Sequence, residues 1–265
     1  MRGQSYWVYS LVSVAVVSAT ALVGTVALAL QRRLLERLLP FSVSLAAGAL
    51  LGAAGAHLVP EAIEELGIGR RFSVLFTAGF AGLFLLERAV GILSASGSRA
   101  GHNHGLEHQQ ELFRKMDGGP GSTALIANIL LGGAIHSFID GVAVATAYGA
   151  GSKTGLATTV AVLLHEIPHH IGDVGVLIYS GLPARRAVIL NILATSSSIL
   201  GALLVLVPGS RVAGVTSLFL PVSAASFLYI AAADLMPELQ HEPEIRRSAA
   251  QILVLWAGVL LMFLL

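Results

Sequence analysis

The stretch HEIPHHIGD (residues 165–173) decides how this sequence must fold, because it places ionisable side chains inside an apolar run from Leu156 to Ile178. A helix turns about 100° per residue, so five polar side chains share one face within roughly 140°. They are His165, Glu166, His169, His170 and Asp173. An ionisable group at mid-membrane costs at least about 2.5–3.5 kcal/mol, so we expect this face to meet other helices, water or a metal ion.

Pro168 strengthens this interpretation. A proline inside a helix removes the hydrogen bond to the carbonyl four residues earlier, which here belongs to Leu164. A freed carbonyl at membrane depth is tolerated only where protein or a wet cavity receives it. Imidazoles and carboxylates one helical turn apart are ligands for divalent transition metals. The stretch therefore indicates a helix that binds a metal ion inside the protein.

The composition is that of an integral membrane protein. Of 265 residues, 55% are hydrophobic and 12% are charged, whereas soluble domains have about 25% charged residues. The mean hydropathy is +0.80. We therefore predict an all-α protein that has the lipid bilayer as a partner and no nucleic acid. Cysteine is absent, which excludes disulfides and thiolate metal ligands.

Eight segments are long and apolar enough to cross a bilayer, which takes about 20 residues. They lie near residues 6–30, 39–60, 71–93, 122–148, 155–179, 186–207, 212–235 and 249–265, and only the last is short. The first is too long and too poor in basic residues for a signal peptide, so we count it as a span. We predict a single transmembrane domain over residues 1–265.

Basic residues in the loops predict the orientation. When the loops are assigned alternately to two sides, one side receives eleven of the 16 lysines and arginines and the other receives five. Because cytoplasmic loops are richer in Lys and Arg, we predict that the first side is cytoplasmic and that both termini lie outside. The lack of cysteine and of an organellar signal is compatible with a bacterial inner membrane, which is the expected location.

Two short motifs at the ends of the second and seventh spans resemble each other. Residues 58–61 read LVPE and residues 235–238 read LMPE. Eight spans put one motif outside and the other inside, so we predict an inverted repeat of spans one to three and six to eight around spans four and five, as in many transporters. The polar residues at these ends are either parts of an ion pathway or interfacial caps. They are His57, Glu61, Asp234 and Glu238.

The fourth span carries a second polar pair. His136 and Asp140 lie one turn apart on one helix face, with the same spacing as the first two histidines of the HEIPHH segment. Two such pairs at mid-membrane favour a metal site over the alternative, a hydrogen-bonded packing network.

Residues 94–121, between the third and fourth spans, are rich in Gly, Ser and charged residues. Such a stretch cannot bury a core, so we predict a disordered cytoplasmic loop. Its histidines are His102, His104 and His108. The loop is either a plain linker or a low-affinity metal-collecting tract.

Together these motifs resemble the ZIP (Zrt/Irt-like) family of divalent metal transporters over nearly the whole chain. The similarity lies in HLVPE at residues 57–61, HSFIDG at 136–141, HEIPHHIGD at 165–173 and FLYIAAADLMPE at 227–238. Within the family, the fifth span is most similar to the signature HExPHExGD. The chain has His170 where this signature has Glu, and Ser137 where many members have Asn.

The resemblance implies a metal centre built from spans four and five, eight spans with both termini outside, and a homodimer. The implied ligands are His136, Asp140, His165 and His169, with Glu166 bridging to or completing a second site. Ser137, His170 and Asp173 complete the set of candidate residues. The implied activity is uptake of Zn²⁺, or of Fe²⁺, Mn²⁺ or Cd²⁺, into the cytoplasm by alternating access. The metal is then the transported ion, and no catalytic cofactor is expected.

An intramembrane zinc protease is a second interpretation, because residues 165–169 also read H-E-x-x-H, the zincin motif in which Glu is the general base. The segment IDG at residues 139–141 would offer a third ligand. Two features argue against it. Pro168 distorts a helix that zincins need regular, and the aspartate motif precedes HExxH, whereas in site-2-type proteases it follows. A membrane metal sensor or a proton-conducting protein is a third interpretation. We therefore expect a transporter and not an enzyme.

Overall fold

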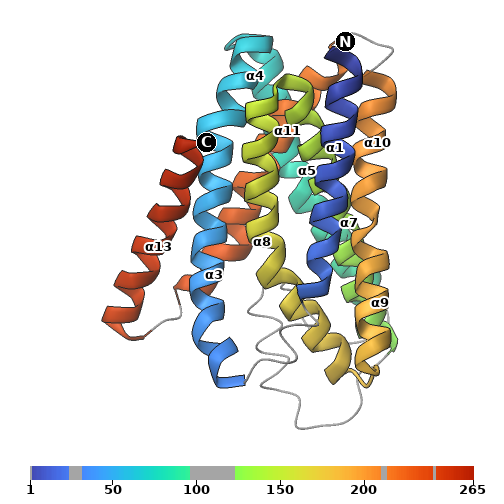
Figure 1. The fold of residues 1–265 in the computed structure, drawn as a ribbon, viewed down its shortest axis with the longest axis vertical. Helices are drawn as coiled ribbons and strands as arrows, with labels where there is room; N and C mark the ends of the chain where they lie inside the picture. Colours follow the sequence, from blue (N-terminus) through green and yellow to red (C-terminus); the bar gives the residue numbers. More distant parts are fainter. Residues whose placement is uncertain (1, 24–31, 96–122, 210–213, 241–242) are drawn as a thin grey trace.

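The computed structural model describes residues 2–23, 32–95, 123–209, 214–240 and 243–265, and all regular structure within these ranges is helical. The helices form a bundle (Figure 1). In chain order the elements are α1 (Arg2–Ala19), η1 (Thr20–Leu22), α3 (Arg32–Ala53), η2 (Ala54–Leu58), α4 (Val59–Leu66), α5 (Arg70–Ala95), α7 (Thr123–Ala150), α8 (Ser152–Tyr179), α9 (Ala184–Thr195), α10 (Ser197–Gly209), α11 (Val215–Tyr229), η3 (Ile230–Leu235), α12 (Met236–Leu239) and α13 (Ile245–Leu264). The predicted all-α class is confirmed.

Long apolar helices dominate the bundle. Six stretches within the described residues are long and apolar enough to cross a membrane: Arg37–Leu66, Arg70–Ala89, Ile126–Ala150, Ala184–Pro208, Thr216–Leu239 and Ile245–Leu264. They correspond to six of the eight expected spans. The last, which was expected to be short, is a helix of 20 residues because it already begins at Ile245. Of the expected first span, the shorter apolar helix Tyr6–Leu22 is described, whereas residues 24–30 lie outside the described residues.

The polar exception among the long helices is α8. It has 28 residues, which is long enough to cross a membrane, but the HEIPHHIGD stretch makes it less apolar than the six. It packs against α3 and α7 in the middle of the bundle (Figure 1). The helix continues through Pro168. It bends part-way along its length in Figure 1, as an interior proline makes a helix do.

Two glycines hold α7 close to α10. A Cβ atom built on Gly141 would lie 1.9 Å from the carbonyl oxygen of Ser198, and one built on Gly201 would lie 1.9 Å from that of Phe138. Such close backbone contact requires the absence of side chains, as at other small-residue crossings in membranes. Because Gly141 directly follows Asp140, this crossing fixes where α7 presents its polar pair.

The sixth expected span is divided into two helices, α9 and α10, which are separated at Ser196. Hydroxyl side chains around the break bind backbone carbonyls: Thr195 Oγ1 donates to Asn191 at 2.6 Å, and Ser197 Oγ donates to Ala134 of α7. Ser and Thr compete with the regular helix in this way. Asn191 is buried one turn before the break.

Two π-helices accompany the LVPE and LMPE motifs. The π-helix η2 lies just before Pro60, and the π-helix η3 lies just before Pro237. A proline cannot donate the helical hydrogen bond, and a wider turn accommodates that loss. In Figure 1, α3 leads upward to α4, whereas α11 leads downward towards the start of α13. The two motifs therefore lie towards opposite ends of the bundle.

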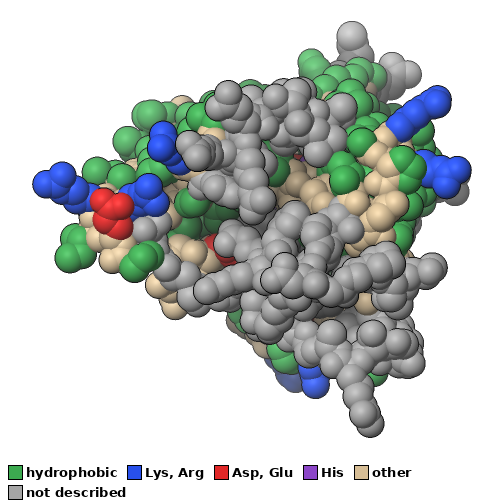
Figure 2. Space-filling view, turned by 90° about the horizontal axis from the view of Figure 1, so that it is seen from below, with side chains coloured by type: hydrophobic (Ala, Val, Ile, Leu, Met, Phe, Trp, Pro, Cys, Tyr) green, Lys and Arg blue, Asp and Glu red, His purple; other side chains and the backbone are tan. Residues whose placement is uncertain are grey.

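The lower end of the bundle in Figure 1 is basic. Figure 2 shows Lys and Arg side chains around its rim. The exposed arginines on helices that begin at this end are Arg37, Arg185, Arg186, Arg246 and Arg247. Both ends of the chain lie in the upper half of Figure 1.

The predicted loop over residues 94–121 is corrected at its start. Residues 94 and 95 continue α5, because the helical segment runs up to the Gly- and Ser-rich stretch rather than stopping before it. Residues 96–122 lie outside the described residues, and with them His102, His104 and His108.

Candidate metal centre

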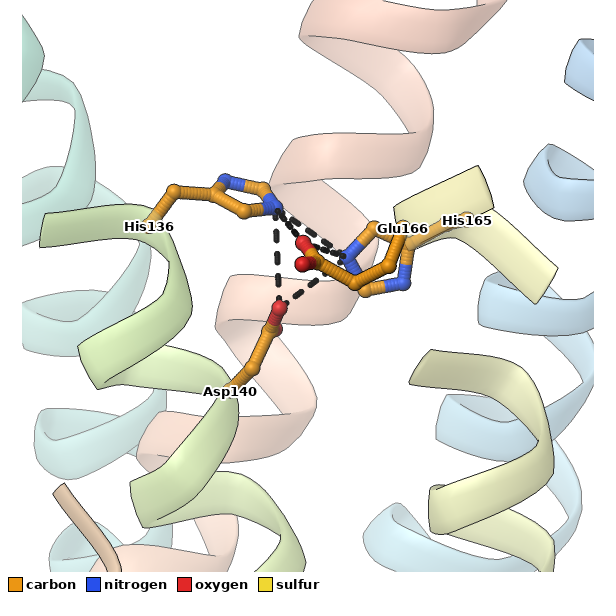
Figure 3. A group of neighbouring side chains, drawn as sticks. All are labelled: His136, Asp140, His165 and Glu166. Atoms are coloured by element: carbon orange, nitrogen blue, oxygen red, sulfur yellow. Dashed lines mark hydrogen bonds and ion pairs between the residues drawn. The ribbon is translucent and has the colours of Figure 1, made fainter. Parts of the chain in front are cut away.

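Two neighbouring helices bring four metal-ligand side chains together. α7 supplies His136 and Asp140, and α8 supplies His165 and the adjacent Glu166. Figure 3 shows the four side chains converging between the helices. One donor atom from each lies within 4.8 Å of all the others. The polar pair of α7 therefore faces the polar stretch of α8.

The spacing of these donor atoms fits a tetrahedral ion. His136 Nε2 lies 3.1 Å from His165 Nε2, 3.6 Å from Asp140 Oδ2 and 3.4 Å from Glu166 Oε1. His165 Nε2 lies 3.2 Å from the same aspartate oxygen and 3.7 Å from the same glutamate oxygen. Bonds of about 2.0–2.1 Å at tetrahedral angles put zinc ligands about 3.3 Å apart. Two nitrogens and two oxygens thus stand at positions that a zinc ion can bridge.

The four side chains are shielded from water. Asp140 and Glu166 are fully buried and His165 is 1% exposed, whereas the His136 side chain keeps 15% exposure. Within the described structure, the oxygens of both carboxylates lack a hydrogen bond of good geometry. A buried carboxylate in that condition is unfavourable unless a cation neutralises it. A packing network would instead satisfy these oxygens with hydrogen bonds, so the arrangement suits a cation better than it suits a packing network.

His165 is oriented as a ligand by its own helix. Its Nδ1 lies 3.2 Å from the carbonyl oxygen of Ala161, one turn earlier in α8. A carbonyl oxygen can only accept a hydrogen bond, so Nδ1 donates its hydrogen. Nε2 therefore keeps a lone pair, which faces the ligand atoms of the other three side chains.

A second group lies directly beside the first and consists of His169, His170 and Asp173. His169 Nδ1 lies 3.0 Å from Asp173 Oδ2, and the His169 ring stacks on that of His136 with 4.7 Å between their centroids. His170 Nε2 lies 2.8 Å from Oε2 of Glu166, the oxygen that the first group does not use. The resemblance implied His169 as a ligand of the first group, and the structure places it in the second.

Ser137 and the residues at the span ends lie outside both groups. Ser137 is buried beside His136 on α7. His57 on η2 donates through Nε2 to the carbonyl of Met262 at 2.7 Å, near the end of α13, where carbonyls lack helical partners. Glu61 on α4 interacts with Thr154 of α8. His57 thus has a structural role as a helix cap, and its role in a pathway stays a prediction.

Asp234 lies on η3 and Glu238 on α12, at the far end of α11. Nothing in the sequence singles out Glu87 of α5, because Glu87 and Arg88 are typical of an interfacial pair. In the structure, Tyr229 OH donates to Oε2 of Glu87 at 2.6 Å. The Glu87 carboxylate also interacts electrostatically with Asp234. Only the packing of α5 against α11 brings these groups together.

The family to which the chain belongs follows from comparison with known proteins. The family described as ZIP zinc transporter matches residues 4–118 and 101–265. The chain belongs to the ZIP zinc transporter family. The resemblance drawn from the motifs is thereby confirmed over nearly the full length.

Vertebrate ZIP proteins are about one third identical to this ZIP chain over the aligned residues. Mouse zinc transporter ZIP4 is 31% identical over 258 residues, which cover 75% of this chain and 38% of ZIP4. Mouse zinc transporter ZIP13 is 31% identical over 253 residues, which cover 84% of this chain and 68% of ZIP13. Human zinc transporter ZIP10 is 34% identical over 147 residues, which cover 53% of this chain and 18% of ZIP10. The chain thus spans less than half the length of ZIP4 and of ZIP10.

Proposed function

We propose that this chain carries divalent transition-metal ions, foremost Zn²⁺, across a membrane into the cytoplasm. The observation that carries the proposal is the spacing of four donor atoms on α7 and α8, three of them on buried side chains, which suits a tetrahedral ion inside an apolar bundle. The similar proteins ZIP4 and ZIP13 are named zinc transporters. An ion bound between membrane helices is released to one side at a time when the helices alternate between two arrangements.

Zinc is proposed as the main ion because of ligand type and geometry. Two imidazoles and two carboxylates at tetrahedral spacing suit Zn²⁺, whereas Mn²⁺ favours octahedral oxygen sites. We expect Fe²⁺, Mn²⁺ and Cd²⁺ to compete with zinc for transport, with Mn²⁺ the weakest of the three.

The pathway is proposed to run from the α4 end of the bundle, past the four donors, to the η3 end. Support comes from Asp234, whose carboxylate interacts electrostatically with Glu87 and with His169. Acidic groups on both sides of the centre would attract the ion without holding it tightly, as conduction requires. Glu61 and Glu238 would then mark the two ends of the pathway.

Eight spans, an inverted repeat and outside termini are part of the proposal. Support comes from the two π-helices, each followed by a proline motif, and from the basic lower end. The chain has no cysteine, so single cysteines at the exposed positions Glu64 and Gln240 report sidedness directly. We expect an impermeant maleimide added outside cells to label Glu64→Cys and not Gln240→Cys. Equal labelling of both variants would refute this topology.

The protease interpretation is not supported. A zincin keeps the glutamate of HExxH off the metal as a general base, whereas Oε1 of Glu166 lies 3.4 Å from His136 Nε2 among the four donors. The second histidine of the motif, His169, pairs with Asp173. The similar proteins reported above are named transporters.

A homodimer and a location in a bacterial inner membrane also belong to the proposal. The mass of the protein in lipid nanodiscs tests the first. Membrane fractionation of the native organism tests the second, and recovery in any other membrane would refute it.

The direct test of the proposed function is metal influx into proteoliposomes that hold the purified protein and a trapped Zn²⁺-sensitive dye. We expect influx with the wild type and its loss with His136→Ala/His165→Ala. The matched control is Thr146→Ala/Thr158→Ala, because both threonines are fully buried on the same two helices and lack a side-chain hydrogen bond in the described structure. Influx that persists in the histidine variant, or that disappears equally in the threonine variant, would remove the four donors from the mechanism.

A further inference from the structure

His170 is the residue at which this chain differs from the HExPHExGD signature, and its contacts join two helices. It is 2% exposed. Its Nε2 lies 2.8 Å from Oε2 of Glu166, and its Nδ1 lies 3.2 Å from Nδ2 of Asn191 on α9. The ring thus connects Glu166 to a helix that supplies none of the four donors.

Asn191 determines which nitrogen of His170 carries the hydrogen. The amide nitrogen of asparagine only donates, so Nδ1 of His170 must accept. A neutral imidazole that accepts at Nδ1 has its hydrogen on Nε2. The Glu166 carboxylate favours the same arrangement, because a lone pair on Nε2 would face a negatively charged oxygen. The contact of 2.8 Å does not have the geometry of a hydrogen bond, but Asn191 and Glu166 both favour the tautomer with its hydrogen on Nε2.

The two neighbouring histidines, His165 and His169, carry their hydrogen on the other ring nitrogen, Nδ1. His165 donates through Nδ1 to the Ala161 carbonyl, and His169 Nδ1 lies 3.0 Å from the Asp173 carboxylate. Each of these rings therefore keeps a lone pair on Nε2, as metal-ligating histidines do. His170 turns an N–H and not a lone pair toward Glu166, so in this tautomer it is not a further ligand on that side.

We propose that His170, oriented by Asn191, turns its N–H toward Glu166 and thereby limits the centre to one divalent ion. The inference rests on the proposed function, since it assumes that the four donors bind the transported metal. A second ion in the group of His169, His170 and Asp173 would need a lone pair from His170. Neither ring nitrogen offers one, because Nδ1 accepts from Asn191 and Nε2 carries the hydrogen.

The rest of the second group is also engaged. His169 and Asp173 contact each other at 3.0 Å, and His170 and Glu166 at 2.8 Å. Both distances are shorter than the roughly 3.3 Å between the ligands of a tetrahedral ion. In the first group the separations run from 3.1 Å to 3.7 Å and bracket that value. The first group therefore matches the ligand spacing around one ion more closely than the second does.

The test is a count of bound zinc. Purified protein in nanodiscs is dialysed against buffered Zn²⁺, and zinc per chain is measured by mass spectrometry. Zinc that remains on the His136→Ala/His165→Ala variant is subtracted, so that other histidines do not contribute. We expect one ion per wild-type chain after subtraction, and a count of two would overturn the proposal.

Three substitutions separate the donor role of His170 from its bulk. His170→Gln keeps an N–H group near Glu166 and should still give one ion. His170→Glu exchanges this donor for a carboxylate and should give two. Asn191→Asp has the same shape as the native residue but accepts from Nδ1, which frees Nε2, and should also give two. Equal counts in the Gln and Glu variants would show that His170 does not set the number of ions.

The number of zinc ions bound per chain is measured separately from zinc transport, so the two proposals can fail separately. One bound ion without influx into proteoliposomes would refute the proposed transport and leave this inference standing. Two bound ions with influx would refute this inference alone.

Discussion

Replacement of Asp140 by asparagine should weaken zinc binding strongly. Asp140 is fully buried, and its Oδ2 lies 3.2 Å and 3.6 Å from the Nε2 atoms of His165 and His136. Asparagine keeps the shape of the side chain and removes its charge. Loss of one partner of a buried ionic contact costs about 3–5 kcal/mol. The dissociation constant for zinc should therefore rise by roughly two to four orders of magnitude.

Without zinc, the Asp140→Asn variant should be at least as stable as the wild type. The carboxylates of Asp140 and Glu166 are both fully buried, with donor oxygens within 4.8 Å of each other. When no cation is bound, two such charges repel each other. Removal of one charge relieves that repulsion, so the unfolding temperature without zinc should not fall. Opposite effects on binding and stability are expected where residues serve function.

Zinc affinity is measured by competition with a fluorescent chelator, and unfolding is followed by intrinsic fluorescence with and without zinc. Asp140→Glu is the matched control, because it keeps the charge and should bind zinc more tightly than Asp140→Asn. A dissociation constant for Asp140→Asn within about threefold of the wild type, or less than about 0.7 kcal/mol, would refute the reasoning.

Three further predictions concern pH, helix packing and the loop. Zinc affinity should fall as the pH drops from about 7.5 to about 5.5, because imidazole binds zinc only in its neutral form; the chelator competition checks this, and a flat profile would argue against imidazole ligands. Gly141→Val places a Cβ atom 1.9 Å from a facing carbonyl and should cost at least the roughly 1–3 kcal/mol of overpacking, whereas Gly132→Val on the same helix meets nothing within 4 Å; similar unfolding temperatures would contradict the close α7–α10 crossing. Deletion of residues 100–110 should leave zinc influx largely intact, and complete loss would show that the segment is more than a linker.

The polar pairs could be predicted because their spacing is local. A helix of known period puts His136 and Asp140 on one face, and the same holds for the polar residues of the HEIPHHIGD stretch. Their distribution between two groups could not be predicted. It depends on how α8 is rotated against α7, which decides that Glu166 and not His169 joins the first group.

Contacts between residues far apart in the sequence could not be predicted from the helical spacing of polar residues. Asn191 and His170 are 21 residues apart on different helices, and Tyr229 and Glu87 are 142 apart. Apolar length predicted six of the spans, yet it could not predict the break at Ser196, where hydroxyl groups bind backbone carbonyls instead of continuing one helix.

Zinc bound to the purified protein should sit among the four donors of α7 and α8, and X-ray absorption at the zinc edge measures its ligands directly. The account predicts four-coordinate zinc with two imidazole nitrogens and two carboxylate oxygens at about 2.0–2.1 Å. The His136→Ala/His165→Ala variant should lose this spectrum. A shell of six oxygens in the wild type, or the same spectrum in both proteins, would contradict the account.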